Sequence, residues 1–260
     1  MKKILLASGC SFTDPNYISN TDPEADTSWP KWPELLAKKL DMDYINLGLG
    51  GAGNEYIYSS LLEQILKTKD KSQIGLVIPA WTQCQRKDWQ INKKGIWRNN
   101  RYEYWGDIFS WLKKSLRYMI SLQTICERFN IPLKQFQMID FYEQWLVGLL
   151  KTDWERMKNK NDPNFKDRME YPGLNVKEDR LRCKQIMMEY DPYINTKDFI
   201  GWPIVSELGG YFIEEKTTRH FPNGAHIKDF IISNGPPFYD MHPNAKGQQK
   251  IAEFLYDRLG

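Results

Sequence analysis

A serine near the start of the chain and a histidine near its end are the residues best suited to do chemistry. Ser11 lies in Gly9-Cys10-Ser11, directly after an apolar run, and His242 lies in Asp240-Met241-His242, before the last apolar segment. A histidine can deprotonate a serine hydroxyl when a carboxylate fixes its tautomer and stabilises the imidazolium that forms. Taken singly, the serine is more typical of a turn and the His-Pro-Asn segment of a helix start. Together they predict nucleophilic chemistry, provided that both loops lie on one edge of a sheet.

The elements around these residues predict such a sheet. Apolar runs typical of buried parallel strands alternate with helical spacing: strands at 4–7, 44–47 and 74–80, and helices at 33–40 and from Asn54, which is expected to cap the second helix. This alternation predicts a parallel sheet with helices on both faces. Loops at the carboxyl ends of parallel strands form the ligand crevice, so the loop that carries Ser11 is expected in that crevice.

The first residues also allow a lipoprotein signal that ends at Cys10. A signal peptide needs an apolar centre of about 7–15 residues, but the run from Ile4 to Ala7 is much shorter. No apolar run approaches the roughly 20 residues that span a bilayer. We therefore expect a strand at this position and a cytoplasmic protein without a membrane partner.

The segment Gly48–Gly53 matches G-x-G-x-x-G, the dinucleotide fingerprint, but a lone match is a weak signal. The fingerprint also requires an acidic residue at the end of the next strand, and that strand ends Val77-Ile78-Pro79-Ala80. Glycines that permit a tight turn are the simpler interpretation. An N–H of this turn, at the start of a helix, is also suited to donate to a developing oxyanion.

The middle of the chain is less regular. Residues 81–108 are polar and rich in aromatics, which suits stacking on sugar rings, a packed subdomain or an oligomer contact. A helix is expected up to about 129, a fourth strand at 133–139, and further helices near 142–158 and 177–190. We predict one domain over 1–260, with an insertion over about 81–230 that the strand at 133–139 interrupts, and a last helix at 245–259.

Composition excludes several classes of protein. The net charge is +3, which is too even to indicate nucleic-acid binding. The four cysteines make no CxxC pair and accompany only three histidines, so neither a zinc cluster nor a disulfide framework is expected. We expect no metal and no organic cofactor.

Three blocks of the sequence together resemble the SGNH (GDSL-type) hydrolases. Gly9-Cys10-Ser11 stands where that family has Gly-Asp-Ser, Asn46–Gly51 resembles its second block, and Asp240–Pro243 its last. The resemblance implies a flavodoxin-like three-layer α/β/α fold and hydrolysis of carboxylic esters through an acyl-enzyme. It makes Ser11 the nucleophile, His242 the base and Asp240 the acid, with the N–H groups of Ser11 and Gly51 in the oxyanion hole.

The chain departs from the family pattern at two points. The third block normally supplies an asparagine after the third strand, where this chain has Thr82 and Gln83, either of which could donate instead. The acid precedes the histidine by two residues rather than the commoner three. Cys10 is a rival nucleophile, although a buried small hydrophobe is the simpler interpretation. The resulting prediction is an esterase or acetylesterase acting on a small-molecule or glycan ester; the alternative is a catalytically inactive SGNH-fold module that binds glycan or protein partners, and nucleotide binding ranks below both.

Overall fold

A computed structural model describes residues 2–19, 24, 26–91, 95–100, 106–142, 176–218 and 242–259. Its centre is a sheet of five strands in the order β2-β1-β3-β6-β7, and every neighbouring pair is parallel. The strands are β1 (Ile4–Ser8), β2 (Asp43–Asn46), β3 (Ile74–Trp81), β6 (Gln135–Gln137) and β7 (Phe199–Ile200). This is the strand order of flavodoxin-like folds, whose ligand crevice lies where the order reverses, between β1 and β3.

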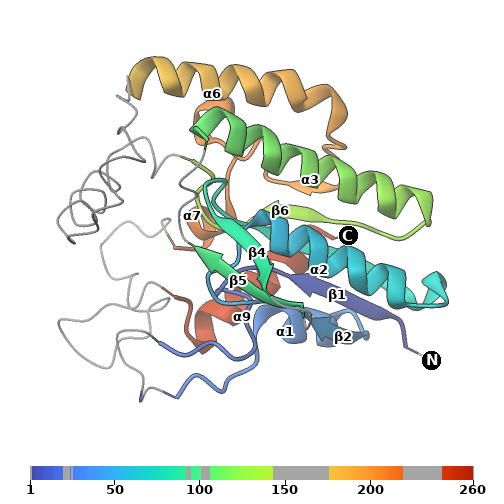
Figure 1. The fold of residues 1–260 in the computed structure, drawn as a ribbon. Coiled ribbons are helices and arrows are strands. Elements are labelled where there is room, and N and C mark those ends of the chain that lie inside the picture. Colours follow the sequence, from blue (N-terminus) through green and yellow to red (C-terminus); the bar gives the residue numbers. More distant parts are fainter. Residues whose placement is uncertain are drawn as a thin grey trace.

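Helices cover both faces of this sheet (Figure 1). One face carries α1 (Trp32–Lys39) and α9 (Ala245–Tyr256), which pack against each other, together with the short α7 (Ile213–Thr218). The other face carries α2 (Asn54–Lys67), α3 (Ile108–Arg128) and α6 (Val176–Tyr190). The predicted three-layer α/β/α fold class is therefore confirmed.

Side chains along each strand alternate between two hydrophobic cores. Leu5 and Ala7 face the core under α1 and α9, whereas Leu6 faces the core under α2 and α3. On β3, Ile78 and Val77 divide in the same way, and all eight residues of that strand are buried. Burial on both faces explains why these strands are continuous apolar runs without polar alternation.

The opening residues form β1, an inner strand of the sheet between β2 and β3. Leu5, Leu6 and Ala7 have no exposed surface, and Cys10 is equally buried. This segment is therefore a strand in the structure, as predicted. Within the described ranges, no helix is both long and apolar enough to cross a membrane.

The middle of the chain contributes two short strands to the sheet, where the sequence predicts one longer strand. The strand expected at 133–139 is shorter, with β6 limited to Gln135–Gln137 and an isolated bridge joining Leu133 to Val77. The two-residue strand β7, at the edge beside β6, was not predicted. The helix expected near 177–190 is α6, and the one expected over 142–158 lies almost entirely outside the described residues. The division into one domain with an insertion stays a prediction.

The polar and aromatic stretch after β3 forms a hairpin that the sequence did not predict. Strands β4 (Lys87–Ile91) and β5 (Ile96–Asn100) pair antiparallel and form a separate sheet of two strands. The hairpin lies beside the start of α2 (Figure 1). It therefore comes next to the loop that follows β2.

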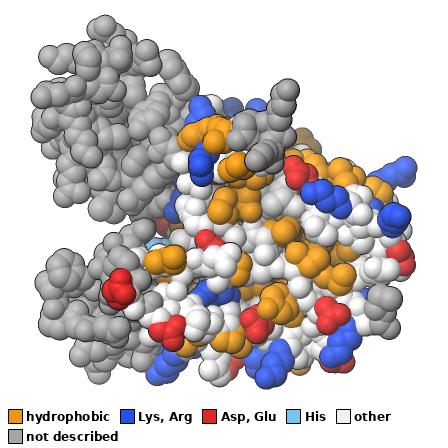
Figure 2. Space-filling view, turned by 60° about the horizontal axis from the view of Figure 1, so that its bottom comes forward, with side chains coloured by type: hydrophobic (Ala, Val, Ile, Leu, Met, Phe, Trp, Pro, Cys, Tyr) orange, Lys and Arg blue, Asp and Glu red, His pale blue; other side chains and the backbone are white. Residues whose placement is uncertain are grey.

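The surface carries charges of both signs. In the space-filling view of Figure 2, the side chains of Lys, Arg, Asp and Glu are interspersed over the part of this face that the structure describes. This distribution agrees with the small net charge of +3.

Candidate active site

Ser11 lies in a tight turn at the carboxyl end of β1. The N–H groups of Thr13 and Asp14 both donate to the carbonyl oxygen of Cys10, at 2.8 and 3.1 Å, which closes the turn around Ser11. Ser11 is half-buried, whereas Cys10 points into the core and is fully buried. The turn thus places the serine side chain at the sheet edge and the cysteine side chain in the core.

His242 reaches this turn from the other end of the chain. Its Nε2 lies 2.7 Å from the Oγ of Ser11, although the two residues are 231 positions apart. It immediately precedes α9, whose first turn is capped because Asn244 Oδ1 accepts a hydrogen bond from the Gly247 N–H at 3.0 Å. The predicted proximity of Ser11 and His242 is therefore present in the structure.

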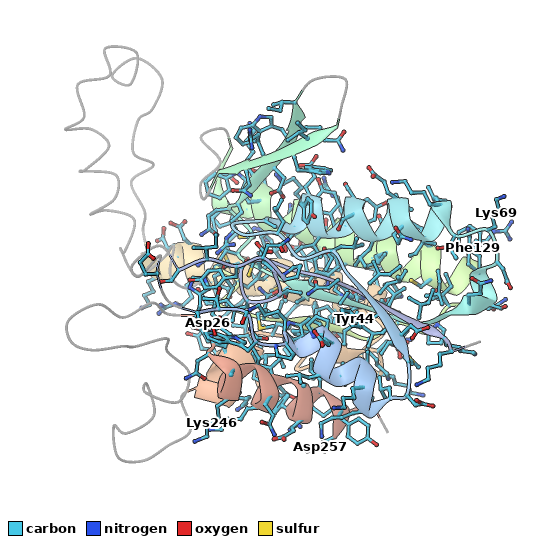
Figure 3. All side chains as sticks on the ribbon, turned by 90° about the horizontal axis from the view of Figure 1, so that it is seen from below. Asp26, Tyr44, Lys69, Phe129, Lys246 and Asp257 are labelled. Carbon is cyan, nitrogen blue, oxygen red and sulfur yellow. The ribbon has the colours of Figure 1, made fainter. Side chains whose placement is uncertain are left out.

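A buried glutamine fixes α9 against the serine turn. Gln248 Nε2 donates to the carbonyl oxygen of Phe12 at 3.0 Å, and its Oε1 accepts the Trp32 N–H at 2.8 Å. The side chain therefore joins α9 both to the residue after Ser11 and to the start of α1. Figure 3 shows α9 lengthwise, with Lys246 near one end of the helix and Asp257 near the other. Because Gln248 is almost fully buried, these bonds are shielded from water.

Two aromatic side chains surround the His242 ring. The Tyr17 hydroxyl lies 2.9 Å from His242 Nδ1, and the two rings stack with their centroids 4.3 Å apart at 28°. The Phe12 ring lies at 5.2 Å. Sequence reasoning missed Tyr17, since a tyrosine in a polar loop gives no signal of its partner. The predicted acid, Asp240, lies outside the described residues, and its role stays a prediction.

The glycine-rich turn after β2 lies next to Ser11. Five of its N–H groups already donate within the protein, and their acceptors are Asn46 Oδ1 for Gly48, Gly9 O for Leu49, Asp14 Oδ2 for Gly50, Leu49 O for Ala52 and Asp88 Oδ1 for Gly53. Only the Gly51 N–H donates to none of the described residues. Gly51 has a left-handed backbone, with φ of 76°. A turn with so few unused N–H groups is poorly suited to a pyrophosphate, and Gly51 is the member left to donate.

The two residues proposed to replace the family's asparagine differ in their surroundings. Thr82 is fully buried, its N–H donates to Asn54 Oδ1 at 2.8 Å, and it does not line the cleft beside Ser11. Gln83 does line the cleft. Its Oε1 accepts a hydrogen bond from Arg86 Nε at 3.3 Å, while Arg86 Nη1 donates to Ala52 O at 3.1 Å. Because a guanidinium only donates, this bond identifies the Gln83 atom that faces Arg86 as the carbonyl oxygen.

The cap of α2 is not the residue that the sequence predicts. Asn54 was expected to cap this helix, but the N-cap position is Gly53, and the Asn54 side chain instead bonds to the Thr82 backbone and to Ser115. The cap comes from the hairpin, because Asp88 accepts the N–H groups of Gly53 and Tyr56 at 2.8 and 3.0 Å. The prediction for Asn54 was wrong because the backbone of Thr82, directly after β3, and the Ser115 hydroxyl on α3 take its side-chain amide.

Further contacts fasten the hairpin to the glycine-rich turn. Asn99 Nδ2 donates to Gly50 O at 2.9 Å, and the Trp97 ring packs edge-on against Tyr56 at 5.3 Å. Burial, aided by the charges of Asp14, Asp88 and Glu63, raises the pKa of Tyr56 to about 12, so its hydroxyl stays protonated and donates to Leu47 O at 2.8 Å. Trp97, one of the aromatics of this stretch, therefore packs against another side chain of the protein.

A cleft of about 680 Å³ opens at this edge of the sheet, and Ser11, Gly51 and His242 line it. Its other walls are mixed: Phe12, Tyr17, Ile18 and Ile139 are apolar or aromatic, and Asp14, Gln83, Arg86, Asn99 and Glu214 are polar. A smaller cavity of about 350 Å³ lies at the opposite end of the sheet, around Gly75 and Leu133, away from the serine and the histidine. Among the residues that the structure describes, no three His, Cys, Asp or Glu side chains gather as a metal site.

Comparison with known proteins finds similarity to solved structures. No protein-family model matches the sequence, and no curated protein matches it. A solved structure described as a "putative lipolytic protein of G-D-S-L family" from Desulfitobacterium hafniense is similar with a TM-score of 0.46 and 13% identity, covering 98% of this chain and 99% of that chain. A "putative arylesterase" from Agrobacterium tumefaciens is similar with a TM-score of 0.36 and 14% identity, covering 99% and 98%. At such identities neither neighbour assigns an activity to this chain.

Proposed function

We propose that this chain is an SGNH-type serine hydrolase that cleaves carboxylic esters through an acyl-enzyme. The observation that carries the proposal is the 2.7 Å approach of His242 Nε2 to Ser11 Oγ in a cleft at the carboxyl edge of the sheet. A nucleophile and base within hydrogen-bond reach are the geometric requirement for activating a serine. The three sequence blocks that resemble the family supply the same two residues.

In the proposed reaction, Ser11 Oγ attacks the ester carbonyl while His242 Nε2 takes the hydroxyl proton. The imidazolium then gives this proton to the leaving alcohol, and an acyl group remains on Ser11. Water, deprotonated by the same nitrogen, then attacks the acyl carbonyl; the bond to Ser11 Oγ breaks, the imidazolium returns the proton to Oγ, and the acid is released. Asp240 is the proposed acid that stabilises the imidazolium, as the family resemblance implies.

The oxyanion that forms at each attack needs N–H donors. We assign the N–H groups of Ser11 and Gly51, since neither donates to a described residue. Gln83 is the proposed third donor, because it lines the cleft and Arg86 orients its amide. Thr82 is the less suitable candidate, since its own N–H is already bonded. One such donor is typically worth about 10²–10³ in rate.

The size and walls of the cleft support small ester substrates. A volume of about 680 Å³ accommodates a small-molecule ester, and the polar side chains of the lining suit hydroxyl-bearing alcohols. The proposed substrate is a small-molecule ester, with acetyl and glycan esters included. The proposal requires no cofactor, and a cytoplasmic location stays a prediction.

The proposal is tested with a short-chain aryl ester and a serine-directed fluorophosphonate probe. Wild type is expected to hydrolyse the ester and to be labelled, and Ser11→Ala and His242→Gln are expected to lose at least about 10³-fold in kcat. Ser72→Ala is the matched control, because Ser72 is exposed and precedes the amino end of β3, at the other edge of the sheet. If wild type neither hydrolyses nor reacts, the alternative of a binding module replaces the proposal; labelling that survives Ser11→Ala removes Ser11 from it.

A further inference from the structure

Tyr17 is held in place by contacts that do not involve His242. Its N–H donates to Asp14 O at 3.3 Å, and its carbonyl oxygen accepts a hydrogen bond from Thr27 Oγ1 at 2.6 Å. The side chain is 8% exposed. The loop after the Ser11 turn therefore holds Tyr17 in a fixed position, so that its ring and hydroxyl can orient a neighbouring side chain.

His242 contacts the Tyr17 side chain through two parts of its ring. One is the nitrogen, since Nδ1 lies 2.9 Å from the Tyr17 hydroxyl, and the other is the ring face, stacked at 4.3 Å. The stack restricts rotation of the imidazole about its last side-chain bond, and the hydrogen bond defines which nitrogen faces Tyr17. With Nδ1 so placed, Nε2 faces Ser11 at 2.7 Å.

We propose that Tyr17 is a positioning residue for His242, whose hydroxyl oxygen accepts the Nδ1–H and thereby leaves the Nε2 lone pair directed at Ser11. This inference rests on the proposed function and deepens it, because it gives the orientation of the imidazole to a neutral side chain, Tyr17, while stabilisation of the imidazolium by charge stays assigned to Asp240. A phenol oxygen accepts as well as donates, so it can take this proton into a hydrogen bond without changing its own charge.

The direction of the hydrogen bond decides whether the site works. If Nδ1–H donates to Tyr17, neutral His242 has an unprotonated Nε2 that accepts the proton of Ser11 Oγ–H. If the Tyr17 hydroxyl donates to Nδ1 instead, the imidazole proton sits on Nε2 and His242 cannot take the serine proton. During attack one proton moves from Ser11 Oγ to Nε2, Nδ1 keeps its own, and Tyr17 keeps its hydroxyl proton. The resulting imidazolium lies over the Tyr17 ring face, which favours a cation.

Two substitutions separate the contributions of the hydroxyl and the ring. Tyr17→Phe keeps the stacked ring and removes the acceptor, and it is expected to lower kcat roughly tenfold with KM unchanged. Tyr17→Leu removes both and is expected to lower kcat further. Tyr58→Phe is the matched control, because Tyr58 also stacks on a ring, that of Tyr118 at 5.2 Å, and does not line the cleft.

The pH profile distinguishes positioning from a general loss of structure. In Tyr17→Phe the imidazolium loses a hydrogen-bond acceptor, so protonation of the base becomes less favourable and the acid limb of kcat/KM moves to lower pH. The other charged groups of the cleft, Asp14, Arg86 and Glu214, are the same in both proteins. A shift between the two profiles is therefore attributable to the missing hydroxyl.

Nitrogen NMR of the histidines gives a readout that does not depend on activity. The chain has only three histidines, and His242→Gln assigns the signals of His242 by difference. The expected result is the Nδ1–H tautomer in wild type and a mixture of tautomers in Tyr17→Phe. An Nε2–H tautomer in wild type overturns the proposal, as do a wild-type kcat, pH profile and spectrum in Tyr17→Phe. If the ester assay fails in wild type, the proposed function fails, while the spectra still decide the role of Tyr17.

Discussion

The carboxylate of Asp88, on strand β4, accepts a hydrogen bond from the N–H of Gly53 at 2.8 Å. The β4–β5 hairpin, which follows β3, thus caps α2, which precedes β3. The same contact fixes the last residue of the glycine-rich turn. Asn99, from the partner strand β5, bonds to Gly50 in the same turn. The proposed oxyanion turn is therefore held between the serine loop on one side and the hairpin on the other.

Replacing Asp88 is expected to loosen this arrangement. Asp88→Ala leaves the N–H groups of Gly53 and Tyr56 without their acceptor near the start of α2, and we expect a loss of about 2 kcal/mol in the free energy of unfolding. Chemical denaturation measures the loss. Asp70→Ala is the control, because Asp70 caps the exposed η1 (Lys71–Gln73), where water can replace the lost acceptor. Equal losses in the two variants would contradict a special role for Asp88.

The stability of the protein should also depend on the ionisation of Asp88. Burial raises the pKa of this carboxyl, although the bonds from Gly53 and Tyr56 oppose the rise. Between the ordinary pKa of an aspartate and this raised pKa, the folded chain binds more protons than the unfolded chain. Stability contributed by Asp88 therefore falls as the pH rises through that window. Asp88→Asn cannot titrate, so this component of the pH dependence is expected to be missing from its unfolding curves; identical slopes in wild type and variant would contradict the assignment.

Gly51→Ala tests the turn itself. Its φ of 76° disfavours a side chain, and a Cβ there would lie 2.6 Å from Asn99 Oδ1. We expect a loss of about 1–2 kcal/mol in stability from the left-handed backbone, and a loss of at least about tenfold in kcat because the oxyanion donor is displaced.

Gly209→Ala is the matched control for this substitution. Gly209 has φ of 84°, but a Cβ there would meet nothing within 4 Å. The control is therefore expected to lose similar stability through its backbone and to keep its kcat. A drop in kcat of the same size in both variants would show that general destabilisation, and not the position of Gly51, lowers the activity.

Gln83→Ala and Thr82→Val test which of the two residues is the third oxyanion donor. The Gln83 amide lines the cleft, so its removal is expected to lower kcat by about 10²–10³ with little change in KM. The Thr82 hydroxyl is buried and has no hydrogen-bond partner among the described residues, so the valine variant is expected to keep both kcat and stability. Steady-state kinetics with an aryl ester decides between them, and the opposite ranking would return the role to Thr82.

The sequence predicts the parts of this fold that depend on local pattern. The buried strands β1 and β3 are apolar throughout, and α9 begins at a cap residue, so these elements and the positions of Ser11 and His242 follow from periodicity and order. The strand order could then place both residues at one edge, because right-handed crossovers leave few alternatives.

The rest depends on contacts between distant segments. β7 has only two residues, and it is a strand because Phe199 and Ile200 pair with β6, which no local pattern reveals. The hairpin could have been predicted, because alternating side chains around Trp89 and around Trp97 flank Gly95, a residue typical of turns. The high aromatic content of the stretch obscured this pattern. Tyr17 left no such pattern, because its partner His242 lies 225 positions away.

Asn54 is the instructive failure, and it leads to a last prediction. A polar residue before an apolar helical pattern is typical of a cap, but here the amide is 3% exposed and bonds to both backbone groups of Thr82 and to Ser115. Asn54→Ala leaves the Thr82 N–H and the Ser115 hydroxyl without that partner in the interior, and we expect a loss of about 3 kcal/mol in the free energy of unfolding.

Glu63→Ala on the same helix is the control, since the Glu63 side chain is exposed and pairs only loosely with Lys67, at 3.8 Å. That change is expected to alter stability by less than about 0.5 kcal/mol. Hydrogen exchange locates the effect, because the Thr82 amide should exchange faster in Asn54→Ala and not in Glu63→Ala. If the Thr82 amide stays as protected as in wild type, the Asn54 side chain is not what joins the start of α2 to the end of β3.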